Sequence, residues 1–164
     1  MNIYLRWGGA ILLMLGALFV SREYEKYLRR RVAEYRGLVS LINHAEDRIK
    51  KSLAHGSGLW RDFSDGAMEK CGILDLLRSG EGLHSAFSAC SDSLALSREA
   101  KARIAEELST LGRGYMNDEL ERLSAVGSRL TAEFESEEAD AEKNIKVSRA
   151  LLLGGALSAV ILVI

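Results

Sequence analysis

Residues 7–20 of the chain read WGGAILLMLGALFV, an apolar stretch that a basic segment follows immediately. Together with residues 3–6, where the long Arg6 side chain can reach the headgroup layer, it supplies the roughly 20 residues that a membrane-spanning helix needs. A second apolar stretch begins near Val147 and runs to residue 164, with Arg149 at its inner boundary. The sequence therefore predicts transmembrane helices over residues 3–21 and 147–164.

The positive charges beside these stretches predict the topology, because Lys and Arg near a span stay on the cytoplasmic side. Before the first stretch stands Arg6, and residues 143–149 carry three basic side chains on the inner side of the second. A membrane-proximal basic cluster follows the first stretch: Arg22, Lys26, Arg29, Arg30 and Arg31. Both spans thus place the central residues in the cytoplasm and both termini outside the bacterial cell membrane.

A cleaved signal peptide is the main alternative for the first stretch. Signal peptides carry positive charge before the apolar run and a small-x-small cleavage site after it, whereas residues 18–22 read LFVSR. That alternative also leaves the second stretch unexplained, so we favour a membrane span.

The composition predicts one helical domain between the spans. The chain of 164 residues contains no proline, and only 7% of its residues are aromatic, while Ala, Leu, Glu, Arg and Lys dominate its middle. We therefore expect an all-α antiparallel helical bundle over residues 22–146, a length sufficient for a modest core. Residues 22–56 carry a net charge of about +4 and residues 115–146 about −5, so the two ends of this domain are electrostatically complementary.

Hydrophobic periodicity divides this domain into two long helices and four short ones. Apolar residues three and four apart predict a helix from residue 22 to 53, ended by Gly56-Ser57-Gly58. They form one apolar stripe: Leu28, Val32, Tyr35, Val39, Ile42, Ala45, Ile49 and Leu53. A second long helix begins with the capping residue Asn117 and runs into the last span, with one face formed by Leu120, Leu123, Gly127, Leu130, Phe134, Ala141 and Ile145. Because both helices leave the same membrane, they must form an antiparallel hairpin. The short helices are expected over residues 59–65, 67–78, 83–90 and 97–111.

We find no motif for catalysis, for a cofactor or for a metal. Glu81 and His84 have the Glu-x-x-His spacing of carboxylate-bridged metal sites, but a second such pair is missing and glycines flank the first. We assign solvated or partner-facing roles to His44 and His55, and read Gly112-x-Gly114 as a helix end. The sequence predicts neither an enzyme nor a nucleic-acid-binding protein.

Two surfaces are candidates for interactions. The basic cluster can attract anionic lipid, pair with the acidic residues between 133 and 142, or do both, within the hairpin or on another subunit. In the second span, small residues recur every four positions at Ala150, Gly154 and Ser158, a pattern that lets another helix approach closely. This face could pack on the first span or on another protein, although membrane helices are often Gly-rich.

The order and spacing of several segments resemble one known family. They are the short first span with its Tyr- and Arg-rich continuation over residues 24–36, the segment LRSGEGL (77–83) before Ala86-Phe87, the Leu111-Gly112-x-Gly114 turn, the acidic helix through Ala139, and the Gly-containing last span. On these features the chain resembles the stage III sporulation protein AB family, a relative of the F-type inner-membrane platform proteins of type II secretion and type IV pilus machines. Family members often have Trp where Phe87 stands, and a Ser-Asp turn followed by Gln where Asn117, Asp118 and Leu120 stand.

The resemblance implies a non-catalytic platform in the complex that links mother cell and forespore. Its partners would be a secretion-type cytoplasmic ATPase, other membrane proteins of the complex and membrane lipids. The alternative is a self-associating membrane coiled-coil scaffold or tether unrelated to secretion, in which homo-oligomers form along the apolar stripe.

Overall fold

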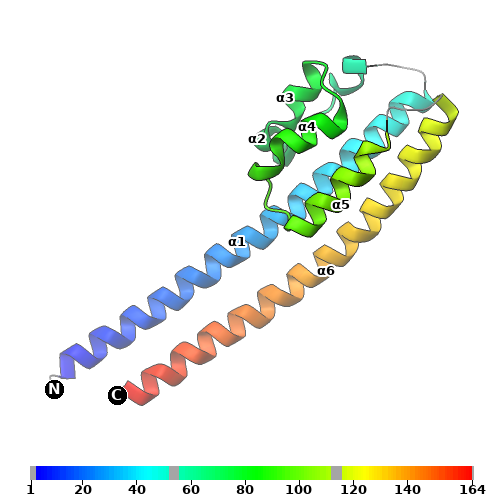
Figure 1. Ribbon diagram of the computed structural model, residues 1–164. Coiled ribbons are helices and arrows are strands. Elements are labelled where there is room, and N and C mark those ends of the chain that lie inside the picture. The colour runs from blue at the N-terminus through cyan, green and yellow to red at the C-terminus, as the bar shows by residue number, and fades with distance from the viewer. Residues whose placement is uncertain (1–2, 52–55, 112–115, 164) are drawn as a thin grey trace. The chain divides into compact units, whose positions relative to one another are not determined.

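The fold was analysed in a computed structural model that describes residues 3–51, 56–111 and 116–163 (Figure 1). Two long helices, α1 (Ile3–Lys50) and α6 (Met116–Val163), are joined by shorter elements. In chain order these are η1 (Gly56–Trp60), α2 (Gly66–Cys71), α3 (Ile73–Arg78), α4 (Leu83–Cys90), η2 (Ser91–Ser93) and α5 (Arg98–Ser109). The structure is 88% helical and the described residues contain no strand, which confirms the predicted all-α class.

The chain divides into two compact units. The terminal unit comprises residues 1–29 and 138–164, and the central unit comprises residues 30–137. The predicted boundaries at residues 21/22 and 146/147 concern the membrane surface, which the division into units does not mark, so they stay predictions. Leu53, His55 and Gly112 to Gly114, which the sequence analysis singled out, lie outside the described residues.

The first and last helical segments lie side by side and antiparallel in the terminal unit (Figure 1). Small and apolar side chains are buried in this unit at Ala10, Ser21 and Leu28 of α1 and at Ala141 of α6. The segments therefore approach each other through a seam that consists largely of small residues.

One hydrophobic core fills the central unit. On α1 the predicted stripe residues Tyr35, Ile42 and Ala45 are buried, and Leu38 and Leu41, which the periodicity did not select, are buried as completely. Core residues also come from every other described element except η2: Leu59, Trp60, Met68, Cys71, Ile73, Leu74, Leu77, Ala86, Phe87, Ala100, Ile104, Leu108, Leu123, Val126 and Leu130. The connecting segments add Phe63, Leu94 and Leu96. Phe87, where the family often has Trp, is therefore a core residue, and Leu120 is only partly buried.

The short helices agree with the sequence prediction in part. Helix α4 has the predicted bounds, and α5 begins after Ser97, whose hydroxyl accepts a hydrogen bond from the Ala100 N–H at 3.2 Å. Helix α6 begins at Met116, one residue before the predicted capping residue Asn117.

Two predicted helices are wrong. The expected helix over residues 59–65 is a single 3-10 turn that ends at Trp60, because the carboxylate of Asp65 caps the next helix through the N–H groups of Ala67 and Met68 at 2.9 and 3.0 Å. The expected helix over residues 67–78 breaks into α2 and α3 at Gly72, whose φ of 83° lies in the left-handed region.

Close packing of α2 against α1 depends on Gly37. A Cβ atom at this position would lie 2.8 Å from Oδ1 of Asp65 and 2.9 Å from Cε of Met68, both below the van der Waals limit. The absence of a side chain at residue 37 therefore allows the capped end of α2 to sit on α1.

We expect Gly37→Ala to lower the unfolding free energy by about 1–3 kcal/mol, because the added methyl overpacks this contact. Gly66→Ala is the matched control, since a Cβ there meets nothing within 4 Å. Denaturant unfolding of both full-length variants in detergent checks this. Equal losses, or no loss for Gly37→Ala, would contradict it.

Candidate functional site

The membrane-proximal basic cluster lies on α1, and most of its members are paired. In the terminal unit Arg29 donates to Glu25 at 2.8 Å and Lys26 pairs with Glu23. Arg22 is exposed and makes no ion pair with any described residue. Among the three cluster residues in the terminal unit, Arg22 is therefore the one whose charge is most available to lipid or to a partner.

Glu25 joins the two helical segments of the terminal unit. Its carboxylate accepts hydrogen bonds from Arg29 of the same helix and from Arg149 of α6, the latter at 2.7 Å. The two guanidinium groups, Arg29 first, lower the pKa of the Glu25 carboxyl. This side chain therefore stays ionised at neutral pH and connects Arg149, at the inner boundary of the second predicted span, to α1.

In the central unit Arg30 takes part in a clamp around a buried carboxylate. Glu34 is 2% exposed and accepts hydrogen bonds from Nε of Arg30, at 2.8 Å, and from the backbone N–H of Ala95, while the same guanidinium donates to the carbonyl of Ser93. Because a buried carboxylate needs such partners, the clamp holds the connection between η2 and α5 on α1. Glu34 was not predicted from the sequence, although its place four residues after Arg30 was a usable signal.

Arg31 joins α1 to the acidic helix α6. Its guanidinium donates to the carboxylate of Glu137, and both side chains are mostly buried. One turn further on, Glu133 accepts from the Tyr35 hydroxyl at 3.4 Å and from Arg103 at 3.3 Å. The predicted pairing between the basic cluster and the acidic run thus occurs within the central unit at Arg31 and Glu137.

We expect Arg31→Gln to lower the unfolding free energy of the full-length chain by about 1.5–3 kcal/mol, since a partly buried charged hydrogen bond is lost. Arg22→Gln should change it by less than about 0.5 kcal/mol, because Arg22 is exposed. Denaturant unfolding followed by circular dichroism measures both. Similar values for the two variants would show that the Arg31–Glu137 pair does not stabilise the unit.

Burial, and after it the charges of Glu133 and Glu137, raise the pKa of Tyr35 to about 12. An unfolded chain would ionise this tyrosine near pH 10, so the stability that the neutral hydroxyl supplies is present below pH 10 and is lost between about pH 10 and 12. We expect the stability advantage of the wild type over Tyr35→Phe to shrink by about 2 kcal/mol between pH 8 and 11.5. Denaturant unfolding at both pH values tests this, and a constant difference would contradict it.

The predicted small-residue face of the second span is open to its surroundings. Ala150, Gly154 and Ser158 are all exposed, and a Cβ atom at Gly154 would meet nothing within 4 Å. Ser158 donates to the carbonyl of Gly154 at 2.9 Å, a contact within the helix. The seam with the first helical segment uses other residues, so the packing of this face on another protein stays a prediction.

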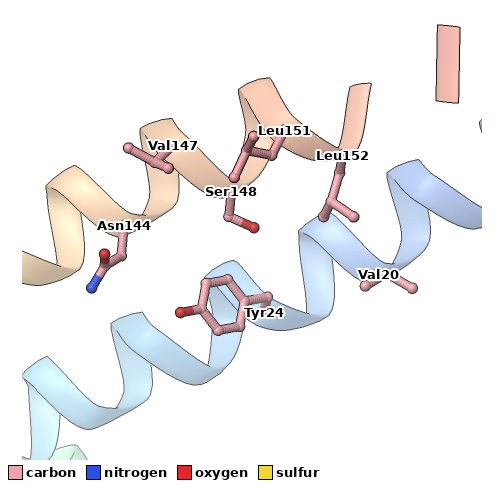
Figure 2. Close-up of a pocket in the computed structure, with 7 residues that line it drawn as sticks. All are labelled: Val20, Tyr24, Asn144, Val147, Ser148, Leu151 and Leu152. Atoms are coloured by element: carbon pink, nitrogen blue, oxygen red, sulfur yellow. The ribbon is translucent and has the colours of Figure 1, made fainter. Parts of the chain in front are cut away.

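An apolar groove runs between the two helical segments of the terminal unit (Figure 2). Its volume is about 460 Å³. The lining residues are Val20, Tyr24, Asn144, Val147, Ser148, Leu151 and Leu152. In Figure 2 the Ser148 hydroxyl lies between the helices, Leu152 points toward α1, and the Tyr24 ring lies over α1. Sequence periodicity did not identify this groove.

The exposed hydrophobic side chains are distributed very unevenly. All the large ones that are exposed among the described residues belong to the terminal unit, from Trp7 to Tyr27 on α1 and from Val147 to Ile161 on α6. By length and composition, one helix of the described residues, Asp118–Ile161, is able to cross a membrane. This criterion supports the second predicted span and does not confirm the first.

The histidines and cysteines have mainly structural surroundings. His44, which we expected to be solvated or partner-facing, is partly buried: its Nε2 lies 3.1 Å from the carbonyl oxygen of Leu59, and its ring centroid is 5.2 Å from that of Phe63. That expectation is therefore wrong, because η1 folds back over α1.

Cys71 and Cys90 are free thiols, and burial raises the pKa of both. Glu81 and His84 are exposed, and the described residues hold no group of three or more side chains suited to a metal.

These features define an all-α protein with a buried-core central unit and a terminal unit that exposes apolar helices, one of them able to cross a membrane. The chain belongs to the stage III sporulation protein AB family, whose family model matches residues 6–164. The family named from the resemblance is thereby confirmed. No curated protein and no solved structure matches the chain.

Proposed function

We propose that this protein is a non-catalytic membrane platform in a secretion-like channel complex between mother cell and forespore. Its central unit would lie in the mother-cell cytoplasm and couple a partner ATPase to the membrane assembly. Both helical ends would span the mother-cell membrane around the forespore, with the termini on its outer side. Family membership supports the sporulation role.

The observation that carries the proposal is the separation of exposed apolar surface between the units. In the terminal unit, side chains such as Leu12, Phe19, Leu151 and Ile161 are each at least 67% exposed. Burying such side chains in lipid gains about 1.5–3 kcal/mol each. Because α1 and α6 both carry them, we place both segments in the bilayer, and the basic residues after the first segment orient them.

The central unit supplies the rigid part of the proposed platform. Its large apolar side chains are buried or partly buried in one core, and the Glu34 clamp holds the segment before α5 on α1. A fixed helical unit that joins two spans can pass a push from a cytoplasmic partner to the membrane assembly. Several short helices packed on α1 also distinguish this chain from the plain coiled-coil tether.

The partner is tested with the full-length chain in lipid nanodiscs and the secretion-type ATPase of the same sporulation complex. We expect direct binding and a changed rate of ATP hydrolysis, and we expect Glu34→Ala to weaken both because the connection between η2 and α5 is released. Arg129→Gln is the control, because it removes a long ion pair with Glu107 at 3.5 Å whose arginine is 70% exposed. If folded chain and folded ATPase neither bind nor change the hydrolysis rate, direct coupling is excluded.

A further inference from the structure

One carboxylate of the terminal unit holds two arginines, one from each helix. Arg29 of α1 donates to Oε1 of Glu25 through Nε at 3.0 Å and through Nη2 at 2.8 Å, and Arg149 of α6 donates to Oε2 through Nη2 at 2.7 Å. Hydrogen bonds from Arg29 and then Arg149 lower the pKa of Glu25, so the carboxylate stays ionised and keeps both guanidinium groups in place. The two helices thus fix a pair of positive charges jointly.

Most hydrogen-bond donors of these two arginines remain available. A guanidinium group carries five N–H donors, of which Glu25 takes two from Arg29 and one from Arg149. Neither arginine donates to another described residue. The side chains are 70% and 56% exposed, respectively, so the remaining N–H groups face the surroundings of the unit.

Arg22 adds a third guanidinium group on the same face of α1. Arg22, Glu25 and Arg29 stand three and four positions apart, a spacing that aligns side chains along one helix face. Arg22 is exposed and makes no ion pair with a described residue. Three guanidinium groups therefore gather around a single carboxylate, an arrangement that attracts an anion able to accept several hydrogen bonds at once.

Exposed aromatic side chains indicate the depth of this cluster in a membrane. Trp7 and Tyr24 are 54% and 40% exposed, and Trp and Tyr are enriched at the two membrane–water interfaces. Their separation along α1 is about 26 Å, close to the roughly 30 Å of a hydrocarbon core. Tyr24 thereby places the neighbouring Glu25, and Arg149 bound to it, in the cytoplasmic headgroup layer, where lipid phosphates lie.

We infer that Arg22, Arg29 and Arg149 form a binding site for the phosphate of an anionic phospholipid, of the phosphatidylglycerol class, in the cytoplasmic leaflet. Arginine matches phosphate oxygens with paired N–H donors, and basic pockets between membrane helices bind such headgroups. A zwitterionic lipid fits less well, because its cationic group meets the excess positive charge. The site differs from a general attraction of the basic cluster in requiring Arg149 of the other helix. It rests on the membrane insertion assumed in the proposed function and does not depend on the ATPase.

Native mass spectrometry of the full-length chain in detergent, with added lipid, tests this site. We expect phosphatidylglycerol to bind about tenfold more tightly than phosphatidylcholine with the same acyl chains, and Arg149→Gln to lower its affinity about tenfold. Lys146→Gln is the matched control on α6, because it removes the same charge from a side chain that is 79% exposed and lies 4.0 Å from Glu142. It should lower the affinity less than about twofold.

Arg22→Gln supplies a second variant that leaves the folded chain intact, since this residue has no ion pair to lose within the described chain. We expect about fivefold weaker binding of phosphatidylglycerol, as for the loss of one cationic contact at a membrane surface. Circular dichroism checks the fold of each variant. If Arg149→Gln does not fold, the result for Arg22→Gln decides, and unchanged binding by a folded Arg22→Gln chain overturns the site.

Three further outcomes would overturn the inference. Equal affinity for the two lipids would remove the anionic preference, and equal losses for Arg149→Gln and Lys146→Gln would show a diffuse attraction in place of a site. Displacement of phosphatidylglycerol by an equal concentration of inorganic phosphate would assign the arginines to free phosphate. Extraction of the chain from vesicles by alkaline carbonate is measured in parallel. An extracted chain refutes the membrane insertion that the proposed function needs, whereas an inserted chain without lipid preference refutes the site alone.

Discussion

The antiparallel pairing of the first and last helices is the constraint on which both units depend. In the terminal unit the pairing uses small residues such as Ala10, Ser21 and Ala141, and in the central unit it uses larger ones such as Leu38, Ile42 and Leu130. This change suits the proposed topology, in which water surrounds the central unit and lipid surrounds the terminal unit. In water the burial of large apolar side chains drives helices together. In lipid the helices associate through van der Waals packing, which small residues strengthen because they let the backbones approach closely. One pair of helices can therefore serve both environments without a change of topology.

Sequence periodicity was sufficient for the two long helices and for α4 and α5, because amphipathic spacing and capping residues are local signals. It failed where the decisive contact is distant in sequence. In the sequence Asp65 is an acidic residue of a loop, and only the structure shows that it caps α2. Gly37 is an unfavourable helix residue in the sequence, and only the structure shows that Met68 packs against it. His44 was misjudged for the same reason, since its partners Leu59 and Phe63 reach it only when η1 folds back.

The charges of the candidate site could be predicted from the sequence, but their partners could not, because most of these partners are distant in the chain. The charge of the basic cluster is visible in the sequence, but its use is decided by partners up to 106 residues away, as between Arg31 and Glu137. The sequence shows that Glu34 stands one helical turn after Arg30. Its burial, however, depends on the hydrogen bond that it accepts from the N–H of Ala95, which is distant in sequence. The groove could not be predicted, because it arises from the spacing between two helices.

The basic cluster shows how one set of charges can satisfy two demands. Its members were expected to orient the first span, and this needs only that they stay on the cytoplasmic side. Arg29, Arg30 and Arg31 nevertheless also bind carboxylates of the folded chain. Such pairing neutralises charge locally without moving it across the bilayer, so the topology signal and the folded structure do not compete. Under the proposed topology, these ion pairs therefore lie next to the membrane segments without opposing their orientation.

The glycines of the terminal unit differ from those of the central unit in their surroundings. A glycine inside a helix is less favourable than alanine by about 1 kcal/mol, so its retention needs a compensating contact or a tolerant environment. Gly37 and Gly127 of the central unit have such contacts within the chain, with Met68 and Ile42. Gly16 and Gly155 have no close neighbour among the described residues. Membrane-spanning helices are richer in glycine than soluble helices. The lipid that the proposed function places around the terminal unit is therefore the tolerant environment for these two residues.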